Sequence, residues 1–181
     1  MKYYFKEDSS RMTEKYFVFS RIGMALISAQ RVELITGKLL EYLIEFNNFY
    51  STVTTLEFLE KTAKSKNGKR TLGAIFHLLK LNPNFIIEDE LDDYLIKRNM
   101  LVHNFLPYLH ISTNGKEAVD FCYDFGRQSE KIENFFKGFV YFLSLRTVKD
   151  KNFLSPEIKN WEDSFIYFME SLEKEKLEDF K

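Results

Sequence analysis

The chain has 181 residues, of which 45% are hydrophobic and 29% charged, and its formal net charge is −1. This length suits one domain with its own hydrophobic core, and the balanced charge excludes nucleic-acid binding through an overall basic field. The single cysteine, Cys122, excludes an internal disulfide and a cysteine-based zinc site, and it is typical of a reducing compartment. Because only seven Gly and three Pro are present, long helices are favoured over many short strands.

A first long helix is predicted from about Thr13 to Asn48, with Thr13 as its N-cap. Apolar residues line two opposite sides of this helix. One side carries Met24, Val32, Ile35, Leu39 and Leu43, and the other carries Leu26, Ile27, Leu34, Leu40 and Ile44. Such a helix is either central in the core or serves a core and a partner surface together.

Two short helices are predicted next, over residues 55–63 and 71–81. The loop between them is basic and contains Lys64, Lys66, Lys69 and Arg70. Two interpretations of this loop stay open. It is either a solvated surface turn or a rim that guides nucleic-acid phosphates, in which case the affinity would fall steeply with salt.

Three further helices complete the prediction, and they cover residues 88–106, 116–147 and about 155–178. Pro107 ends the first of them, and Pro156 opens the last. The middle one is rich in Phe and Tyr, and its helical spacing favours packing in the core or at a dimer interface over base stacking. No segment shows the two-residue alternation of a strand. We therefore expect an all-α fold, a single domain over residues 1–181 built as a bundle of long antiparallel helices.

The helix over residues 88–106 carries a charged residue on its apolar side. At helical spacing, Arg98 lies in the middle of an apolar stripe, with Asn99 and His103 one turn apart at its edge. The stripe contains Leu91, Tyr94, Leu95, Leu101, Val102, Phe105 and Leu106. A buried guanidinium is costly unless its charge is paired, so this position requires an explanation.

Two interpretations of Arg98 stay open. In the first, Arg98 forms an ion pair with Glu33 or Glu41 of the first helix and fixes the register of the two helices. In the second, the stripe lines a cleft, and the planar guanidinium binds a phosphate there. His103 could then transfer a proton at neutral pH, and Asn99 could orient the imidazole or hold a ribose hydroxyl.

A cation beside an imidazole provides what RNA cleavage without a metal requires. A base takes the proton of the 2′-OH, whose oxygen attacks the adjacent phosphorus, while a cation stabilises the phosphorane and an acid protonates the leaving 5′-oxygen. One Arg98 and one His103 per chain are too few for both proton transfers. A two-fold dimer with two copies across one cleft would supply the full set.

The sequence Arg98-Asn99-x-x-x-His103 resembles the R-x(4–6)-H motif of the HEPN superfamily, helical dimeric domains that include many ribonucleases of toxin–antitoxin, abortive-infection and CRISPR systems. The resemblance covers residues 14–148, including "SAQRVELITGKLLEYL" in the first helix and "LGAIFHLLK" ahead of the motif. It leaves the helix over about 155–178 as an addition. It implies a HEPN-like antiparallel bundle that forms a two-fold homodimer.

The resemblance also implies roles for single residues. Arg98 would hold the substrate phosphate and stabilise the charge of the transition state, His103 would act as acid or base, and Asn99 would orient the reacting groups. Glu33 is a weaker candidate from the first helix, and His110 could reach the mouth of the cleft.

One position departs from the family pattern. In relatives paired with a nucleotidyltransferase antitoxin, a Tyr that accepts the modification stands two residues after the His. Phe105 occupies that position here, although Tyr108 is close. This form of control is therefore not expected from the motif itself.

The resemblance implies a metal-independent endoribonuclease that leaves a 2′,3′-cyclic phosphate, with RNA as substrate and an antitoxin or defence-system protein as partner. The alternative is a catalytically inactive HEPN-like module that binds RNA, a nucleotide or a protein. Three His residues on three elements, without an H-x(3)-H pair, predict no metal site, and we expect no cofactor. Because no stretch is typical of a signal peptide or a membrane span, we expect a cytoplasmic protein without membrane contact.

Overall fold

The computed structural model describes residues 9–50, 72, 88–105, 115–148 and 151–178. Its elements are α1 (Ser9–Tyr50), α4 (Glu88–Asn99), the π-helical turn η1 (Met100–Asn104), α6 (Lys116–Thr147), the short 3-10 turn η2 (Lys151–Phe153), α7 (Pro156–Lys159) and α8 (Glu162–Glu178). Nearly all of these residues are helical, and the described part of the chain contains no strand. The prediction of an all-α fold is confirmed at this level.

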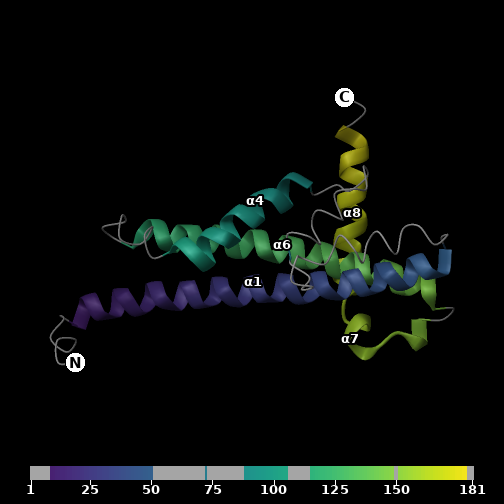
Figure 1. The fold of residues 1–181 in the computed structure, drawn as a ribbon, viewed down its shortest axis with the longest axis horizontal. Helices are drawn as coiled ribbons and strands as arrows, with labels where there is room; N and C mark the ends of the chain where they lie inside the picture. The colour runs from purple at the N-terminus through teal and green to yellow at the C-terminus, as the bar shows by residue number, and fades with distance from the viewer. Residues whose placement is uncertain (1–8, 51–71, 73–87, 106–114, 149–150, 179–181) are drawn as a thin grey trace, which may run out of the picture.

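The two long helices, α1 and α6, lie side by side and run in the same direction (Figure 1). The residue numbers of contacting pairs increase together along both helices. Arg21 contacts Tyr123, and ten residues further on Arg31 contacts Glu133. The expectation of antiparallel long helices is therefore wrong for this pair. Of the described helices that lie along this pair, α4 runs in the opposite direction to both, because it returns the chain between the end of α1 and the start of α6 (Figure 1).

Helix α6 lies at the centre of the described fold, since α1, α4 and α8 all pack against it. Its buried side chains include Phe125, Ile132, Phe135, Phe136, Val140, Tyr141 and Leu143. The prediction that these aromatic residues belong to the core is confirmed for the buried ones, whereas Tyr123 is 43% exposed. Helix α8 crosses α6 steeply at Gly138, where the absence of a side chain allows the two backbones to meet (Figure 1).

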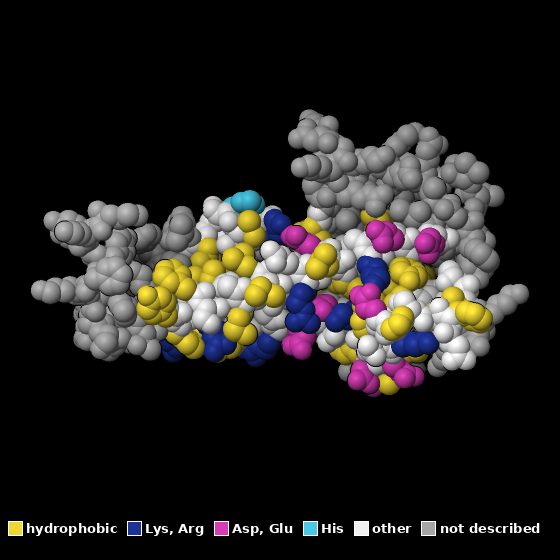
Figure 2. Space-filling model, turned by 90° about the horizontal axis from the view of Figure 1, so that it is seen from below, with side chains coloured by type: hydrophobic (Ala, Val, Ile, Leu, Met, Phe, Trp, Pro, Cys, Tyr) yellow, Lys and Arg dark blue, Asp and Glu magenta, His cyan; other side chains and the backbone are white. Residues whose placement is uncertain are grey.

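The two apolar sides of α1 differ in how far they are buried. Val32, Ile35 and Leu39 are buried against the core, as is Leu40. Most of the second side faces outward, with Leu26, Ile27 and Leu34 exposed, and Figure 2 shows hydrophobic side chains along this face. Met24, which we placed on the first side, is also exposed, at 55%. Of the two predicted possibilities, the fold has a helix with one core face and one free apolar face.

Two predicted helix boundaries are wrong. Helix α1 begins at Ser9, so Thr13 lies inside the helix and is not its N-cap. The region 155–178 is not one helix, because the chain turns between α7 and α8 at Asn160, whose N–H donates to the Glu157 carbonyl (3.2 Å). This turn places Trp161 in the core. A periodic pattern cannot reveal a turn of this kind when apolar residues stand on both sides of it.

Several predictions fall outside the described residues. They are the short helices over 55–63 and 71–81 (Leu72, helical and half-buried, excepted), the basic residues Lys64, Lys66, Lys69 and Arg70, and Tyr108 and His110. Among the helices that the structure does describe, none is long and apolar enough to cross a membrane.

Candidate functional site

The apolar stripe of the motif helix packs as predicted for most of its described residues, but Val102 is 42% exposed. Leu91, Tyr94, Leu101 and Phe105 are buried against the core, where the Tyr94 ring stacks on the Phe125 ring of α6 with centroids 5.2 Å apart. This packing fixes the rotation of α4 and leaves Arg98 between the inward residues. The Arg98 side chain is 25% exposed, so it is half-buried rather than fully enclosed.

Arg98 reaches across to α1 and pairs with Glu33. Its Nε and Nη2 both donate to Glu33 Oε1, at 3.1 and 2.5 Å, and the Glu33 side chain is 38% exposed. Of the two candidate partners in the first helix, the structure selects Glu33, while Glu41 is exposed. The predicted ion pair between the first helix and the motif helix is therefore present, and it accounts for the charge on the apolar stripe.

The ion pair with Glu33 occupies only part of the Arg98 guanidinium. Nη1 of Arg98 donates to Asn99 Oδ1 at 3.3 Å, so three of its five N–H donors are taken by Glu33 and Asn99. Among the residues that the structure describes, no acceptor takes the other two N–H donors on the terminal nitrogens. A guanidinium held in place by a carboxylate, with two donors left, can still donate to phosphate oxygens.

Tyr94 lies next to this pair and stays uncharged. Burial raises the pKa of its phenol well above the usual range, and the negative charge of Glu33 raises this pKa further. The phenol is therefore a neutral hydrogen-bonding group beside the pair and no source of negative charge against a bound anion.

His103 lies in the π-helical turn η1, where the backbone bonds to the fifth residue instead of the fourth. In an α-helix, His103 would point about 140° away from Arg98. The π turn inserts an additional residue into the turn that leads to His103. Its imidazole is exposed to solvent, and π turns of this kind are frequent at functional sites.

The structure thus brings together Arg98, Asn99 and Glu33, and it places His103 on the following turn of the same helix without a hydrogen bond or ion pair to the other three. Phe105, two residues after His103, is buried against Phe121 (ring centroids 5.7 Å apart) and belongs to the core. No group of His, Cys, Asp and Glu in the described ranges is arranged to hold a metal ion.

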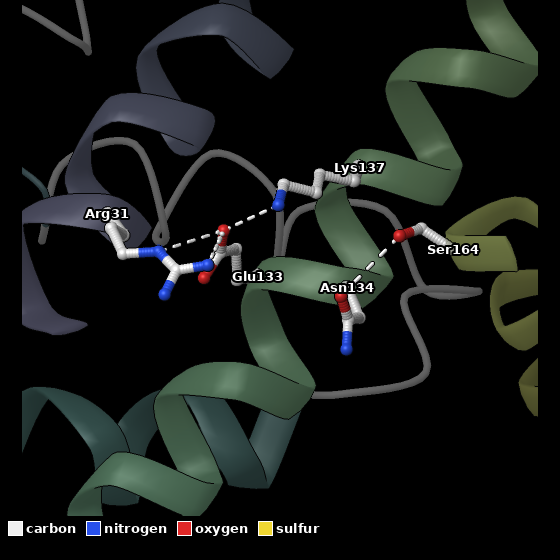
Figure 3. A network of polar contacts seen from close by, with 5 residues as sticks. All are labelled: Arg31, Glu133, Asn134, Lys137 and Ser164. Atoms are coloured by element: carbon white, nitrogen blue, oxygen red, sulfur yellow. Dashed lines mark hydrogen bonds and ion pairs between the residues drawn. The ribbon is translucent and has the colours of Figure 1, made fainter. Parts of the chain in front are cut away.

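One polar cluster was not predicted from the sequence. Glu133 of α6 is 8% exposed and accepts from Arg31 of α1 (3.0 Å) and from Lys137 (2.6 Å) (Figure 3). In the same view Ser164 of α8 donates to Asn134 at 3.4 Å. The signal in the sequence was a glutamate between Ile132 and the buried phenylalanines of α6, a position that requires a cationic partner.

Together, the fold and this site define an all-α protein whose first helix and motif helix are joined by a half-buried arginine–glutamate pair. The chain matches no family model, no curated protein and no solved structure.

Proposed function

We propose that this protein is a HEPN-like, metal-independent endoribonuclease that leaves a 2′,3′-cyclic phosphate. The observation that carries the proposal is the arrangement of Arg98, which has two N–H donors left beside Asn99, with His103 exposed on the next turn. A fixed guanidinium and an accessible imidazole on one helix are the two groups that the reaction requires.

In the proposed reaction, a base removes the proton of the 2′-OH and the 2′-oxygen forms a bond to phosphorus. Arg98 stabilises the added negative charge on the phosphorane. Its ion pair with Glu33 holds the guanidinium in place while the substrate reacts. The bond from phosphorus to the 5′-oxygen then breaks, and an acid protonates that oxygen. His103 of one subunit acts as base and the same residue of a second subunit acts as acid, so the site needs a two-fold dimer.

The outer face of α1 supports dimer formation. Tyr16, Ile27 and Leu34 are 65%, 58% and 75% exposed, and their spacing places them on one side of the helix. Ile27 and Leu34 lie equally far from a point between Gln30 and Arg31. A two-fold axis at that point would set Ile27 of each antiparallel copy against Leu34 of the other, which makes the face self-complementary.

The double variant Ile27→Asp, Leu34→Asp is expected to be monomeric at concentrations where the unchanged chain is dimeric, because four carboxylates would be buried at the contact. Light scattering after size exclusion measures the mass, and circular dichroism checks that helicity is kept. Phe153→Asp is the matched control, since Phe153 is an exposed apolar residue (78%) that belongs to η2 and not to the outer face of α1. A wild-type chain that stays monomeric at millimolar concentration would contradict the dimer.

By resemblance to the HEPN superfamily, the proposed ribonuclease would act as a toxin or antiviral effector, held in check by an antitoxin or a defence-system partner. A second candidate function is a catalytically inactive module that binds RNA, a nucleotide or a protein. It is favoured by the engagement of Arg98 with Glu33, since an arginine already neutralised by a carboxylate can serve the fold alone.

Cleavage of end-labelled total RNA in EDTA tests the proposal. The wild-type protein is expected to produce cuts ending in 2′,3′-cyclic phosphate, and His103→Ala is expected to slow them by about 10²–10⁴-fold, because general acid–base catalysis contributes that much. The exposed position of His103 predicts an unchanged thermal midpoint, within about 0.5 kcal/mol of stability.

The matched control is Asn104→Ala, which changes an exposed residue of the same π-helical turn and is expected to leave cleavage unchanged. If folded wild-type dimer cuts no RNA over a range of substrates and pH values, the ribonuclease is wrong and the binding module takes its place. Cleavage that persists in His103→Ala would mean that another residue transfers the protons.

A further inference from the structure

A second polar site lies on the opposite flank of α1 from Arg98. It is a groove of about 290 Å³ between α1 and α6, and its lining includes Arg21, Arg31, Tyr123, Arg127 and Glu130. Arg31 and Glu33 are two residues, and therefore about 200°, apart around α1. For this reason Arg31 turns to α6 while Glu33 turns to α4, and the groove is separate from the site proposed for cleavage.

Arg21 has no carboxylate partner among the described residues. Its guanidinium lies between the rings of Phe17 and Tyr123, with its carbon 4.7 and 4.8 Å from the ring centroids. Within the described ranges, Nη1 donates to the sulfur of Met24 at 3.6 Å, and the buried Nε has no hydrogen-bond partner. The two rings therefore fix the position of a guanidinium that no oxygen acceptor of the described residues engages.

The charges around the groove favour an anion. Glu133 is shared by Arg31 and Lys137, so this group of three carries one net positive charge (Figure 3). Arg127 pairs with Asp124 on the surface at 2.9 Å, a contact of little strength because both side chains are more than 60% exposed. Arg21 contributes a further positive charge, and the exposed Glu130 contributes a negative one. The charged residues in and around the groove therefore sum to +1, whereas the whole chain carries −1.

Tyr123 adds a flat surface to the same groove. Its ring is 43% exposed, and only one of its faces can be occupied by Arg21. A planar base can stack on the other face, and such stacking is worth about 1–3 kcal/mol in proteins that bind single-stranded nucleic acid. Cys122 also lines the groove, but burial raises the pKa of its thiol to about 11, so the site offers binding and no thiolate nucleophile.

We propose that this groove binds a nucleoside phosphate, with Arg21 and Arg31 on the phosphate and Tyr123 stacked on the base. The groove volume is near the lower limit of ligand pockets, which suits one nucleotide unit. The same chemistry is presented by a free nucleotide and by the 5′-terminal nucleotide of an RNA strand. The proposal does not depend on cleavage at Arg98 and His103.

Isothermal titration of the full chain tests the proposal, in the His103→Ala background so that RNA is not cut. The probes are AMP, adenosine, inorganic phosphate and a 5′-phosphorylated RNA decamer. We expect AMP or the decamer to bind, with Arg21→Gln weakening the binding at least tenfold. Tyr123→Ala should weaken AMP at least tenfold and inorganic phosphate clearly less, because phosphate has no base to stack and is affected only through the contact of the ring with Arg21.

Arg146→Gln is the matched control, since Arg146 also lies over a ring of α6, that of Phe142 (5.3 Å), but does not line the groove. It should bind like the parent. Binding of AMP identifies a free nucleotide as the ligand, and binding of the decamer alone identifies an RNA end. The proposal is overturned if the folded protein binds neither, or if the binding ignores Arg21→Gln and follows Arg98→Ala instead.

Discussion

Arg98→Ala is expected to reduce the proposed RNA cleavage by about 10²–10³-fold while lowering stability by only about 1–2 kcal/mol. The first figure is the loss that follows removal of one donor to the charge of a transition state. The second lies between the roughly 0–1 kcal/mol of exposed ion pairs and the roughly 3–5 kcal/mol of buried ones, because Arg98 and Glu33 are 25% and 38% exposed. Single-turnover cleavage and urea unfolding measure the two effects separately.

Glu33→Gln is the companion variant. It removes the charge that Arg98 faces and keeps the shape of the side chain, so helix packing should survive. If the pair only fixes the register of α1 and α4, then Arg98→Ala, Glu33→Gln and the double variant of both should lose similar amounts of stability. Any activity should then be unchanged in all three.

Arg98→Lys separates charge from geometry, because a lysine keeps the charge and lacks the bidentate fork. A fully active Arg98→Ala protein would contradict the catalytic role proposed for Arg98.

Gly138→Ala is expected to destabilise the protein by about 2–3 kcal/mol, near the upper part of the range for overpacking. A Cβ at Gly138 would overlap the carbonyl oxygen of Ser164 and lie 2.5 Å from Cβ of Phe168. Both contacts belong to α8, and a backbone oxygen cannot turn aside as a flexible side chain can. Helix α8 must therefore shift away from α6 and loosen the contacts of Phe168 with Phe135 and Phe139.

Thermal unfolding measures this effect. About 1 kcal/mol moves the midpoint by about 2–4 °C in a chain of this size, so a fall of about 4–12 °C is expected. Gly126→Ala is the control in the same helix, because nothing lies within 4 Å of a Cβ at Gly126. Alanine there should be neutral or stabilise by up to about 1 kcal/mol, since glycine is a poor helix former. Equal midpoints for the two variants would contradict the close crossing of α6 and α8.

The candidate site was predictable in part. The period of residues 88–106 placed Arg98 on a buried stripe, and a buried guanidinium implies a carboxylate partner, which limited the candidates to the glutamates of the first helix. The π-helical turn at His103 was not predictable, because "MLVHN" is compatible with an ordinary α-helix. The groove with Arg21 and Tyr123 was missed for another reason: its residues stand about a hundred positions apart in the chain.

By itself, the sequence determined the helical class, the long helix over residues 116–147 and the apolar stripe around Arg98, because each depends on spacing within one segment. Only the tertiary structure decided that Glu33 and not Glu41 pairs with Arg98, that α1 and α6 run parallel, and that the second apolar side of α1 stays exposed. These features depend on which faces of distant segments meet. The period of a helix describes its faces, but it does not say which neighbour covers them.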